Sequence, residues 1–296
     1  MLEPIGKEEF IKLVNESSKD DKIKELYHYT NSDGLMGIIN NGEFWATHHK
    51  FQKDDTEIKY GIELINNKML EYIEDESDNT KKSILQEFNT KAFNVAEYSP
   101  HIFDYYSVSF SSDNDSLPLW REYGDKGKGY TLCFIIDDFN VESIGLDIVK
   151  LANLEISTLL IKVIYKEDEQ EKIIRSFYKL IRSDVTENTT VKQLLDNYCK
   201  WYYNLPVLYK QPSYDFENEW RIVYKTSQIL NDHISFRSKG SDIIPYIKIG
   251  FKEERMPKNK ITVGYKADYE KAHKVINIMH RQNNLEPPSI NHSLIK

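Results

Sequence analysis

The chain has few of the residues that mark disulfide-linked or membrane-spanning proteins. It contains only 2 cysteines in 296 residues, Cys133 and Cys199, which excludes a disulfide framework and a C-x-x-C zinc site. Apolar runs such as 131–136 are far too short to span a bilayer. The N-terminus lacks the basic start and apolar stretch of a signal peptide. These absences predict a cytoplasmic protein with buried free thiols and no membrane partner.

The glycine motifs of common nucleotide-binding sites are also missing. No G-x-G-x-x-G follows a predicted strand, and neither a P-loop nor a G-x-S-x-G turn is present. The segment 124–129 (GDKGKG) lies between a predicted helix and a predicted strand, so it is interpreted as a turn. His48 and His49 are adjacent and lack a third ligand at helical spacing, so no metal site is predicted. The net charge of −8 argues against non-specific coating of nucleic acid.

Composition and periodicity predict an α+β fold. With 40% hydrophobic and 29% charged residues the chain is globular. Short strands are predicted at 25–30, 43–47, 101–111, 130–136, 158–165, 219–226, 243–251 and 261–265. Helices are predicted at 7–18, 34–40, 118–123 and 268–284, and as pairs within 56–96 and 167–203. The irregular alternation favours a central mixed, mostly antiparallel sheet. Without a Pro/Gly-rich linker, 1–296 is expected to be one domain with helical insertions at about 56–96 and 167–208.

Three short segments carry unusual combinations of residues. They are Tyr27-His28-Tyr29-Thr30 with Glu43-Phe44-Trp45 after it, Ser107–Ser111 with Leu119-Trp120-Arg121-Glu122-Tyr123 after it, and Glu217-Asn218-Glu219-Trp220-Arg221. In this order they resemble the bacterial family known as domain of unknown function 2971, from about residue 25 to the C-terminus. Lys53-Asp54-Asp55-Thr56 before Glu57 departs from that family, which usually has Asn-Asp-Pro there.

The same order is similar to the opening of ADP-ribosyltransferase folds, in particular toxins that modify DNA. Those folds place a His or Arg on a first strand, a Ser-x-Ser on a second, and the Glu of an E-x-E motif on a later one. The resemblance implies an ADP-ribosyltransferase-like fold, NAD as co-substrate, and transfer of ADP-ribose to a protein, a nucleic acid or water. It also implies a toxin or phage-defence setting.

Breaking the bond between nicotinamide and ribose develops positive charge on the ribose, which a nearby carboxylate stabilises. Glu219 is expected to take that role, with Glu217 orienting or deprotonating the acceptor, since alternate strand residues share a face. The residues expected to bind NAD are His28, Tyr29, Thr30, Ser109, Ser111, Trp120, Tyr123 and Arg221. Of these, His28 can bond ribose hydroxyls and the aromatic rings can stack on the nicotinamide.

Each of these residues also has a structural interpretation. His28 can be an ordinary strand histidine, and Trp120 and Tyr123 can pack in the core. The serines can be the outward side of an alternating strand. The E-x-E-W-R segment can be a ladder of charges in which Arg221 pairs with Glu219. Asp54 and Glu57 can cap a long helix.

Two other functions remain open. A non-catalytic module binding a nucleotide or a partner would tolerate His28 and Glu219 being far apart. A metal-dependent nuclease would need Asp54, Glu57, Glu217 and Glu219 to share a divalent ion. The NAD hypothesis requires that His28 and Glu219 converge on one cleft lined by aromatic residues. The acceptor and the oligomeric state are not determined by the sequence.

Overall fold

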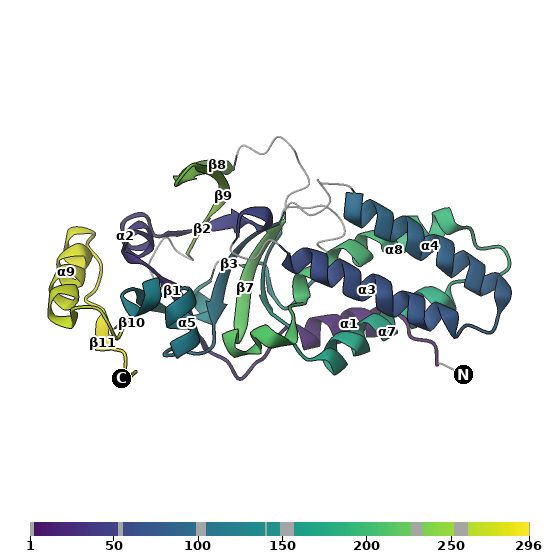
Figure 1. The fold of residues 1–296 in the computed structure, drawn as a ribbon, viewed down its shortest axis with the longest axis horizontal. Coiled ribbons are helices and arrows are strands. Elements are labelled where there is room, and N and C mark those ends of the chain that lie inside the picture. The colour runs from purple at the N-terminus through teal and green to yellow at the C-terminus, as the bar shows by residue number, and fades with distance from the viewer. Residues whose placement is uncertain are drawn as a thin grey trace.

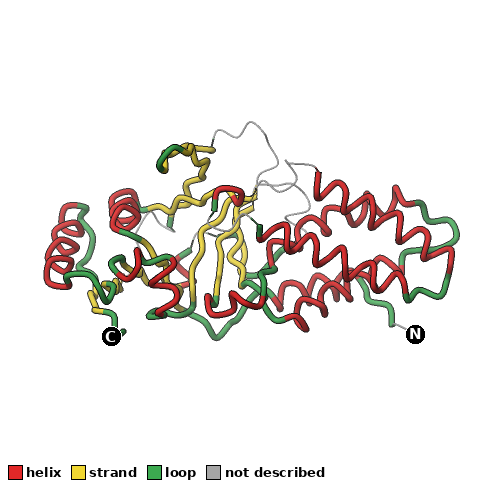
Figure 2. Tube along the Cα trace, viewed as in Figure 1, coloured by secondary structure: helices red, strands yellow, loops and turns green. Residues whose placement is uncertain are grey.

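The computed structural model describes residues 3–52, 56–98, 105–139, 141–148, 157–225, 233–251 and 260–295. The fold is α+β, with a mixed, mostly antiparallel sheet curled into a half-barrel and a bundle of helices at one end (Figure 1). Figure 2 shows the separation plainly, with the helices of the bundle away from the strands and the C-terminal helix at the opposite end.

The main path of the sheet runs β11-β10-β4-β1-β3-β2-β9-β8. Strand β3 also pairs with β7, which pairs with β6, and β6 pairs with β5. Only the pairs β5–β6 and β10–β11 are parallel among the described strands. The strands are β1 (Glu25–Thr30), β2 (Glu43–His48), β3 (Tyr105–Ser111), β4 (Tyr130–Ile135), β5 (Ser143–Ile144), β6 (Ser157–Lys162), β7 (Glu219–Lys225), β8 (Ile234–Lys239), β9 (Asp242–Gly250), β10 (Lys260–Val263) and β11 (Ser289–His292).

The helices fall into two groups. The bundle contains α1 (Lys7–Ser17), α3 (Glu57–Glu74), α4 (Asn79–Tyr98), α7 (Glu167–Ser183) and α8 (Val191–Asn204). Around the sheet lie α2 (Ser32–Asn41), α5 (Leu117–Glu122) and α9 (Tyr269–Gln282). Short 3₁₀ turns connect them: η1 (His49–Phe51), η2 (Asp125–Gly127), η3 (Ile136–Asp138), η4 (Leu205–Leu208) and η5 (Pro212–Glu217). No helix in the described ranges is both long and apolar enough to cross a membrane.

Strand β7 separates two hydrophobic cores, because its side chains alternate between two faces. Trp220, Ile222 and Tyr224 pack in the core enclosed by the curled sheet. Val223 packs on the other face in the core of the helical bundle. Every residue of β7 is buried. Polar residues on the bundle face of this strand must therefore find partners inside the protein.

Local sequence signals account for several helix boundaries. The Asn31 side chain accepts a hydrogen bond from Gly34 N at 2.9 Å and caps α2. Gly42 ends that helix in the left-handed conformation (φ 64°). The predicted breaks near 74–79 and 183–184 are confirmed by the ends of α3 and α7. Strands β5, β8 and β11 were not predicted, and residues 101–104 of the strand predicted at 101–111 lie outside the described residues.

Candidate functional site

Five charged side chains lie together where β7 meets the helical bundle. Their side chains are between 5% and 11% exposed. Isolated buried charges are costly by several kcal/mol each, so such groups persist only when they are paired. We call this set the charge cluster; its members are Glu57, Lys210, Glu217, Glu219 and Arg221.

Lys210 is the centre of the charge cluster. Its Nζ lies 2.6 Å from Glu57 Oε1, 2.5 Å from Glu217 Oε2 and 3.1 Å from Glu219 Oε2. These three acceptors match the three donors of an ammonium group. Gln170 on α7 fixes the backbone there, because its Nε2 donates to Lys210 O at 2.9 Å. Burial alone would lower the pKa of Lys210, but the carboxylates, Glu219 foremost, outweigh it and raise that pKa.

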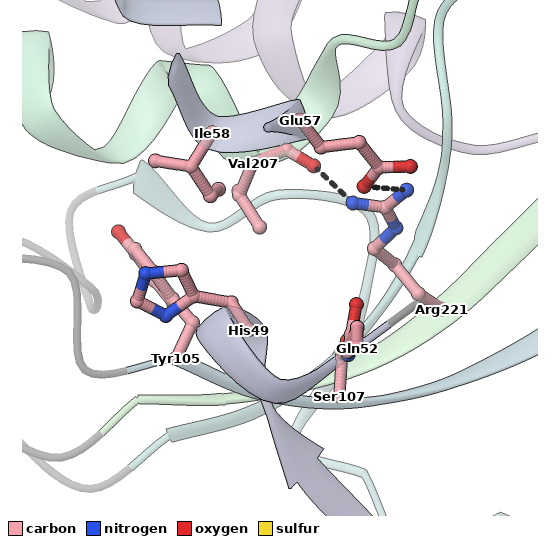
Figure 3. A pocket seen from close by; sticks show the side chains of 8 residues that line it. All are labelled: His49, Gln52, Glu57, Ile58, Tyr105, Ser107, Val207 and Arg221. Atoms are coloured by element: carbon pink, nitrogen blue, oxygen red, sulfur yellow. Dashed lines mark hydrogen bonds and ion pairs between the residues drawn. The ribbon is translucent and has the colours of Figure 1, made fainter. Parts of the chain in front are cut away.

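Arg221 completes the charge cluster from the strand side. Its Nη2 lies 2.7 Å from Glu219 Oε2. The same atom lies 3.1 Å from Glu57 Oε2, a contact drawn in Figure 3. Burial would raise the pKa of Glu219, but Arg221 and Lys210 reverse this and lower it to about 2. The Glu219–Arg221 pair expected from their shared strand face is therefore present, and Glu219 is held as an anion.

The charge cluster has one carboxylate more than it has cations. Three glutamates face Lys210 and Arg221, so full ionisation would leave one buried negative charge. Burial raises the pKa of Glu57, and the nearby Glu219 raises it further, while Arg221 and Lys210 offset part of the rise. We therefore expect Glu57 to take up a proton more readily than Glu219.

Glu217 connects the charge cluster to an open cleft of about 610 Å³. It lies in the wall of this cleft together with Tyr123, Tyr214, Phe216 and Arg121. The Tyr123 hydroxyl donates to Glu217 Oε1 at 2.8 Å, while Glu217 Oε2 faces Lys210. Volumes of about 300–1,000 Å³ are typical of small-molecule sites. The carboxylate of Glu217 is thus oriented from both sides at the edge of a ligand-sized space.

A second, much smaller cavity lies behind the charge cluster (Figure 3). Its volume is about 10 Å³, which is room for roughly one water molecule. Gln52, Ser107 and Arg221 are among the residues that line it. Gln52 Nε2 donates to Ser107 Oγ at 2.6 Å, and the buried Nε of Arg221 has no hydrogen-bond partner within the described ranges. This cavity is too small for an organic ligand.

His28 and Thr30 lie on the opposite face of the sheet from Glu219. The strand register aligns Tyr27 with Ser111, and Ser111 with Glu219, so these three share a face. His28 is the next residue along β1 and therefore points the other way.

The contacts of His28 agree with that placement. Its ring packs 5.6 Å from the rings of both Phe44 and Phe110, in the core enclosed by the sheet. Its Nδ1 lies 2.9 Å from Ser109 O, and burial lowers the pKa of its ring. Thr30 packs against the start of α2, where an added Cβ on Gly34 would meet Thr30 Oγ1 at 2.0 Å. The expectation that His28 and Glu219 converge on one cleft is therefore wrong.

Tyr29 and Trp120 have structural contacts. The Tyr29 hydroxyl donates to Asp113 O at 3.0 Å, and its ring packs edge-on against Trp120 at 5.1 Å. Trp120 is fully buried, and its Nε1 donates to Asp115 at 2.6 Å. Tyr123, three residues further on, is 38% exposed and lines the cleft. Of the aromatic residues expected to stack on a ligand, Tyr123 alone has its ring in this cleft wall.

The two serines of β3 support the glutamates in different ways. Ser109 hydrogen-bonds the Glu219 side chain and contributes to its low pKa. Ser111 Oγ donates to Glu217 O at 2.6 Å and so holds the backbone that carries the cleft carboxylate. Glu217 is not in a strand, since it ends η5 and is followed by Asn218 with φ 43°. The two glutamates converge on Lys210 through this turn rather than through strand alternation.

Lys210, Tyr165 and Gln170 were missed by sequence reasoning. Tyr165 OH accepts a hydrogen bond from Glu219 N at 3.1 Å. In the sequence, Lys210 directly follows the apolar stretch 205–209. A single charge after an apolar stretch was the one sequence signal that could have marked it as a buried charge. Asp54, considered as a metal ligand or helix cap, lies outside the described residues. The described part of the chain holds no group of three or more His, Cys, Asp or Glu side chains arranged for a metal ion.

Comparison with known proteins gives one family match. The family described as Protein of unknown function (DUF2971) matches residues 119–222, a shorter span than the resemblance read from residue 25 onwards. The matched range runs from α5 to β7 and includes Tyr123, Lys210, Glu217, Glu219 and Arg221. No curated protein and no solved structure matches the chain. The match therefore covers most of the residues of the cleft and of the charge cluster, and it assigns no activity.

Proposed function

We propose that this protein is an NAD-consuming enzyme of the ADP-ribosyltransferase type, with Glu217 as the carboxylate at the ribose. The observation that carries the proposal is the position of Glu217 in the wall of the cleft. Its two oxygens are held by Lys210 at 2.5 Å and by Tyr123 at 2.8 Å. A preoriented carboxylate in a partly dehydrated site stabilises a developing oxocarbenium ion without reorganising during the reaction.

The rest of the cleft fits a dinucleotide. Arg121 lines it and can bind the two phosphates in bidentate fashion. Tyr214 and Phe216 present aromatic surface for flat rings. The same cleft thus offers a carboxylate, a guanidinium and aromatic walls, which complement a ribose cation, a diphosphate and a heterocycle.

The reaction would use these residues as follows. The bond between ribose C1′ and the nicotinamide nitrogen breaks, and its electron pair leaves with nicotinamide. Glu217 stabilises the positive charge on the ribose. An oxygen or nitrogen of a macromolecule, or a water, forms the new bond to C1′ and gives its proton to Glu217. Glu219 acts as a positioning residue, because it holds Lys210 and Arg221 rather than lining the cleft.

The second candidate is a non-catalytic module that binds a nucleotide or a partner in the same cleft. It is favoured by the placement of His28 on the far face of the sheet and by the enclosure of Glu219 between two cations. A metal-dependent nuclease has less support. The ammonium of Lys210 lies where Glu57, Glu217 and Glu219 converge, and a metal ion shared by these carboxylates would have to displace it.

The test is nicotinamide release from NAD by the purified protein, with and without cell lysate as a source of acceptor. Glu217→Gln preserves the shape of the side chain and removes its charge. Glu63→Gln is the matched control, since Glu63 is a 52% exposed glutamate on α3. We expect release by the wild type and by Glu63→Gln, and a loss of at least about 100-fold in Glu217→Gln, as for removal of one electrostatic stabiliser.

Each outcome decides between the candidates. Binding of NAD without release of nicotinamide, in either condition, would replace the enzyme by the binding module. Release that is equal in Glu217→Gln and the wild type would refute the role of Glu217. Where release occurs, labelled NAD identifies the acceptor by the product that carries the label.

A further inference from the structure

We infer that Asp115 is a positioning residue, through which the segment after β11 fixes the α5 wall of the cleft and sets Tyr123 against Glu217. We call residues 293–295 the tail segment. The importance of the Tyr123–Glu217 contact for a reaction rests on the proposed function. The link from the tail segment to the cleft rests on the contacts of these residues alone and can be measured without turnover.

The short helix α5 forms one wall of the cleft. Pro118, Arg121 and Glu122 on this helix, and Tyr123 directly after it, line the cleft. A helix of 6 residues is not stable by itself, since isolated helices shorter than roughly 12 residues are marginal in water. The position of this wall is therefore determined by what the other face of α5 contacts.

The other face of α5 is held by Trp120. This residue is fully buried and packs with Leu119 in a small hydrophobic core. Ile295 of the tail segment packs against the same core. The indole Nε1 of Trp120 donates to Asp115 Oδ1 at 2.6 Å. Both the apolar and the polar contacts of this helix thus lead towards the tail segment.

Asp115 joins α5 to the tail segment. Its Oδ1 also accepts a hydrogen bond from Ser293 Oγ at 2.6 Å, and its Oδ2 accepts one from Leu294 N at 2.7 Å. Ser293 is buried, and its backbone N donates to Val263 O on β10 at 2.9 Å. A carboxylate has enough lone pairs to accept all three side-chain and backbone donors at once. The sheet therefore holds the tail segment, and Asp115 extends that hold to Trp120.

Tyr123 connects this link to the carboxylate in the cleft. Its backbone N donates to Leu119 O at 2.8 Å, so its position follows that of α5. Its hydroxyl donates to Glu217 Oε1 at 2.8 Å, while Glu217 Oε2 contacts Lys210. Displacement of α5 would lengthen the first of these contacts and leave Glu217 oriented from the Lys210 side.

The experiment uses Asp115→Asn and Ser293→Ala, which leave every residue of the cleft wall in place. In Asp115→Asn the amide NH₂ must face a donor, since one carboxylate oxygen is replaced. Ser293→Ala is the milder variant and removes only the hydroxyl that donates to Asp115. The protein is labelled with [ζ-¹³C]tyrosine, and the Tyr123 signal is assigned by its loss in Tyr123→Phe. The chemical shift of this carbon reports whether the hydroxyl donates a hydrogen bond.

We expect the Tyr123 signal to move in both variants, and further in Asp115→Asn. Amide hydrogen exchange in α5 should become faster by roughly tenfold or more, as for the loss of one hydrogen bond to a charged group. Asp78→Ala is the matched control. Asp78 Oδ1 accepts from Thr80 N and Lys81 N at the start of α4, so this variant weakens the bundle without touching α5. It should leave the Tyr123 signal and exchange in α5 unchanged.

The outcomes separate this inference from the proposed function. A Tyr123 signal that stays in place in both variants would overturn the inference, and so would an equal shift in Asp78→Ala. If Asp115→Asn does not fold, the result for Ser293→Ala decides. A shifted signal in a protein that releases no nicotinamide from NAD would support the link and refute the enzyme. Release of nicotinamide together with an unshifted signal would refute the link and support the enzyme.

Discussion

The charge cluster predicts that two of its carboxylates can each be removed at modest cost, while removing both is severely destabilising. Three carboxylates face two cations, and the pKa of Glu57 is raised overall whereas that of Glu219 is lowered. Glu57→Gln puts a neutral amide of similar shape in place of the carboxyl whose pKa is raised. The free energy of unfolding should therefore change by less than about 1 kcal/mol.

Glu219→Gln removes the partner that lies 2.7 Å from Arg221. Glu57 lies 3.1 Å from the same Nη2 and remains as a carboxylate partner for Arg221. Two carboxylates, Glu57 and Glu217, then face the two cations in this variant. We expect a cost of about 1.5–3 kcal/mol, the range for a hydrogen bond to a charged group.

The double variant Glu57→Gln/Glu219→Gln has no such replacement. Lys210 and Arg221 would face only Glu217, and one buried cation would be unpaired. Breaking a buried pair in this way costs about 3–5 kcal/mol. The double variant should therefore exceed the sum of the single variants by roughly 0.5–3 kcal/mol, as expected for residues in one network.

Urea unfolding at pH 7 measures all three free energies by linear extrapolation. Glu63→Gln, alone and combined with Glu219→Gln, is the control pair and should be additive. The reasoning is refuted if the double variant equals the sum of the single variants within about 0.5 kcal/mol. It is equally refuted if Glu57→Gln costs as much as Glu219→Gln.

Four other predictions concern pH and the C-terminus. Glu219 has a pKa lowered to about 2, so its stabilisation is present above pH 4.5 and should be lost as pH falls from there towards 2. The pKa of Glu57 is raised, so the free energy of unfolding should decline as pH rises above 4.5, and Glu57→Gln should remove that decline. Urea unfolding midpoints measured against pH test the predictions for Glu219 and Glu57. Burial lowers the pKa of Lys225 to about 8, and no described carboxylate lies at ion-pair distance from it. The stability of the wild type should therefore rise between pH 8 and 10.5. Lys225→Met should be more stable than the wild type by roughly 1–3 kcal/mol at pH 7 and should lack that rise. A rise of equal size in the variant would contradict this. Asp115 accepts hydrogen bonds from Trp120 and from two residues after β11. Asp115→Ala should lower the free energy of unfolding by about 2–4 kcal/mol and expose the C-terminus to carboxypeptidase. An unchanged digestion rate, followed by mass spectrometry, would argue against this role of Asp115.

The sequence by itself determined the elements whose signals are local. Asn31 and Gly42 bound α2 because a side-chain cap and a left-handed residue act within one turn of the helix. The polar breaks at 74–79 and 183–184 divided the helical stretches correctly. The segment 124–129 was identified as a turn, and it joins α5 to β4. The Glu219–Arg221 pair followed from strand alternation alone.

Only the tertiary structure decided which of these residues meet. Strand register places His28 and Glu219 on opposite faces of the sheet, and that register depends on pairs more than 80 residues apart in sequence. Strand β11 forms only by parallel pairing with β10, so its polar sequence carried no sign of it. Lys210 becomes the centre of the charge cluster because α3, η5 and β7 bring three carboxylates to one point. Burial at that point makes the pairing obligatory, and burial is a property of the packed chain rather than of any one segment.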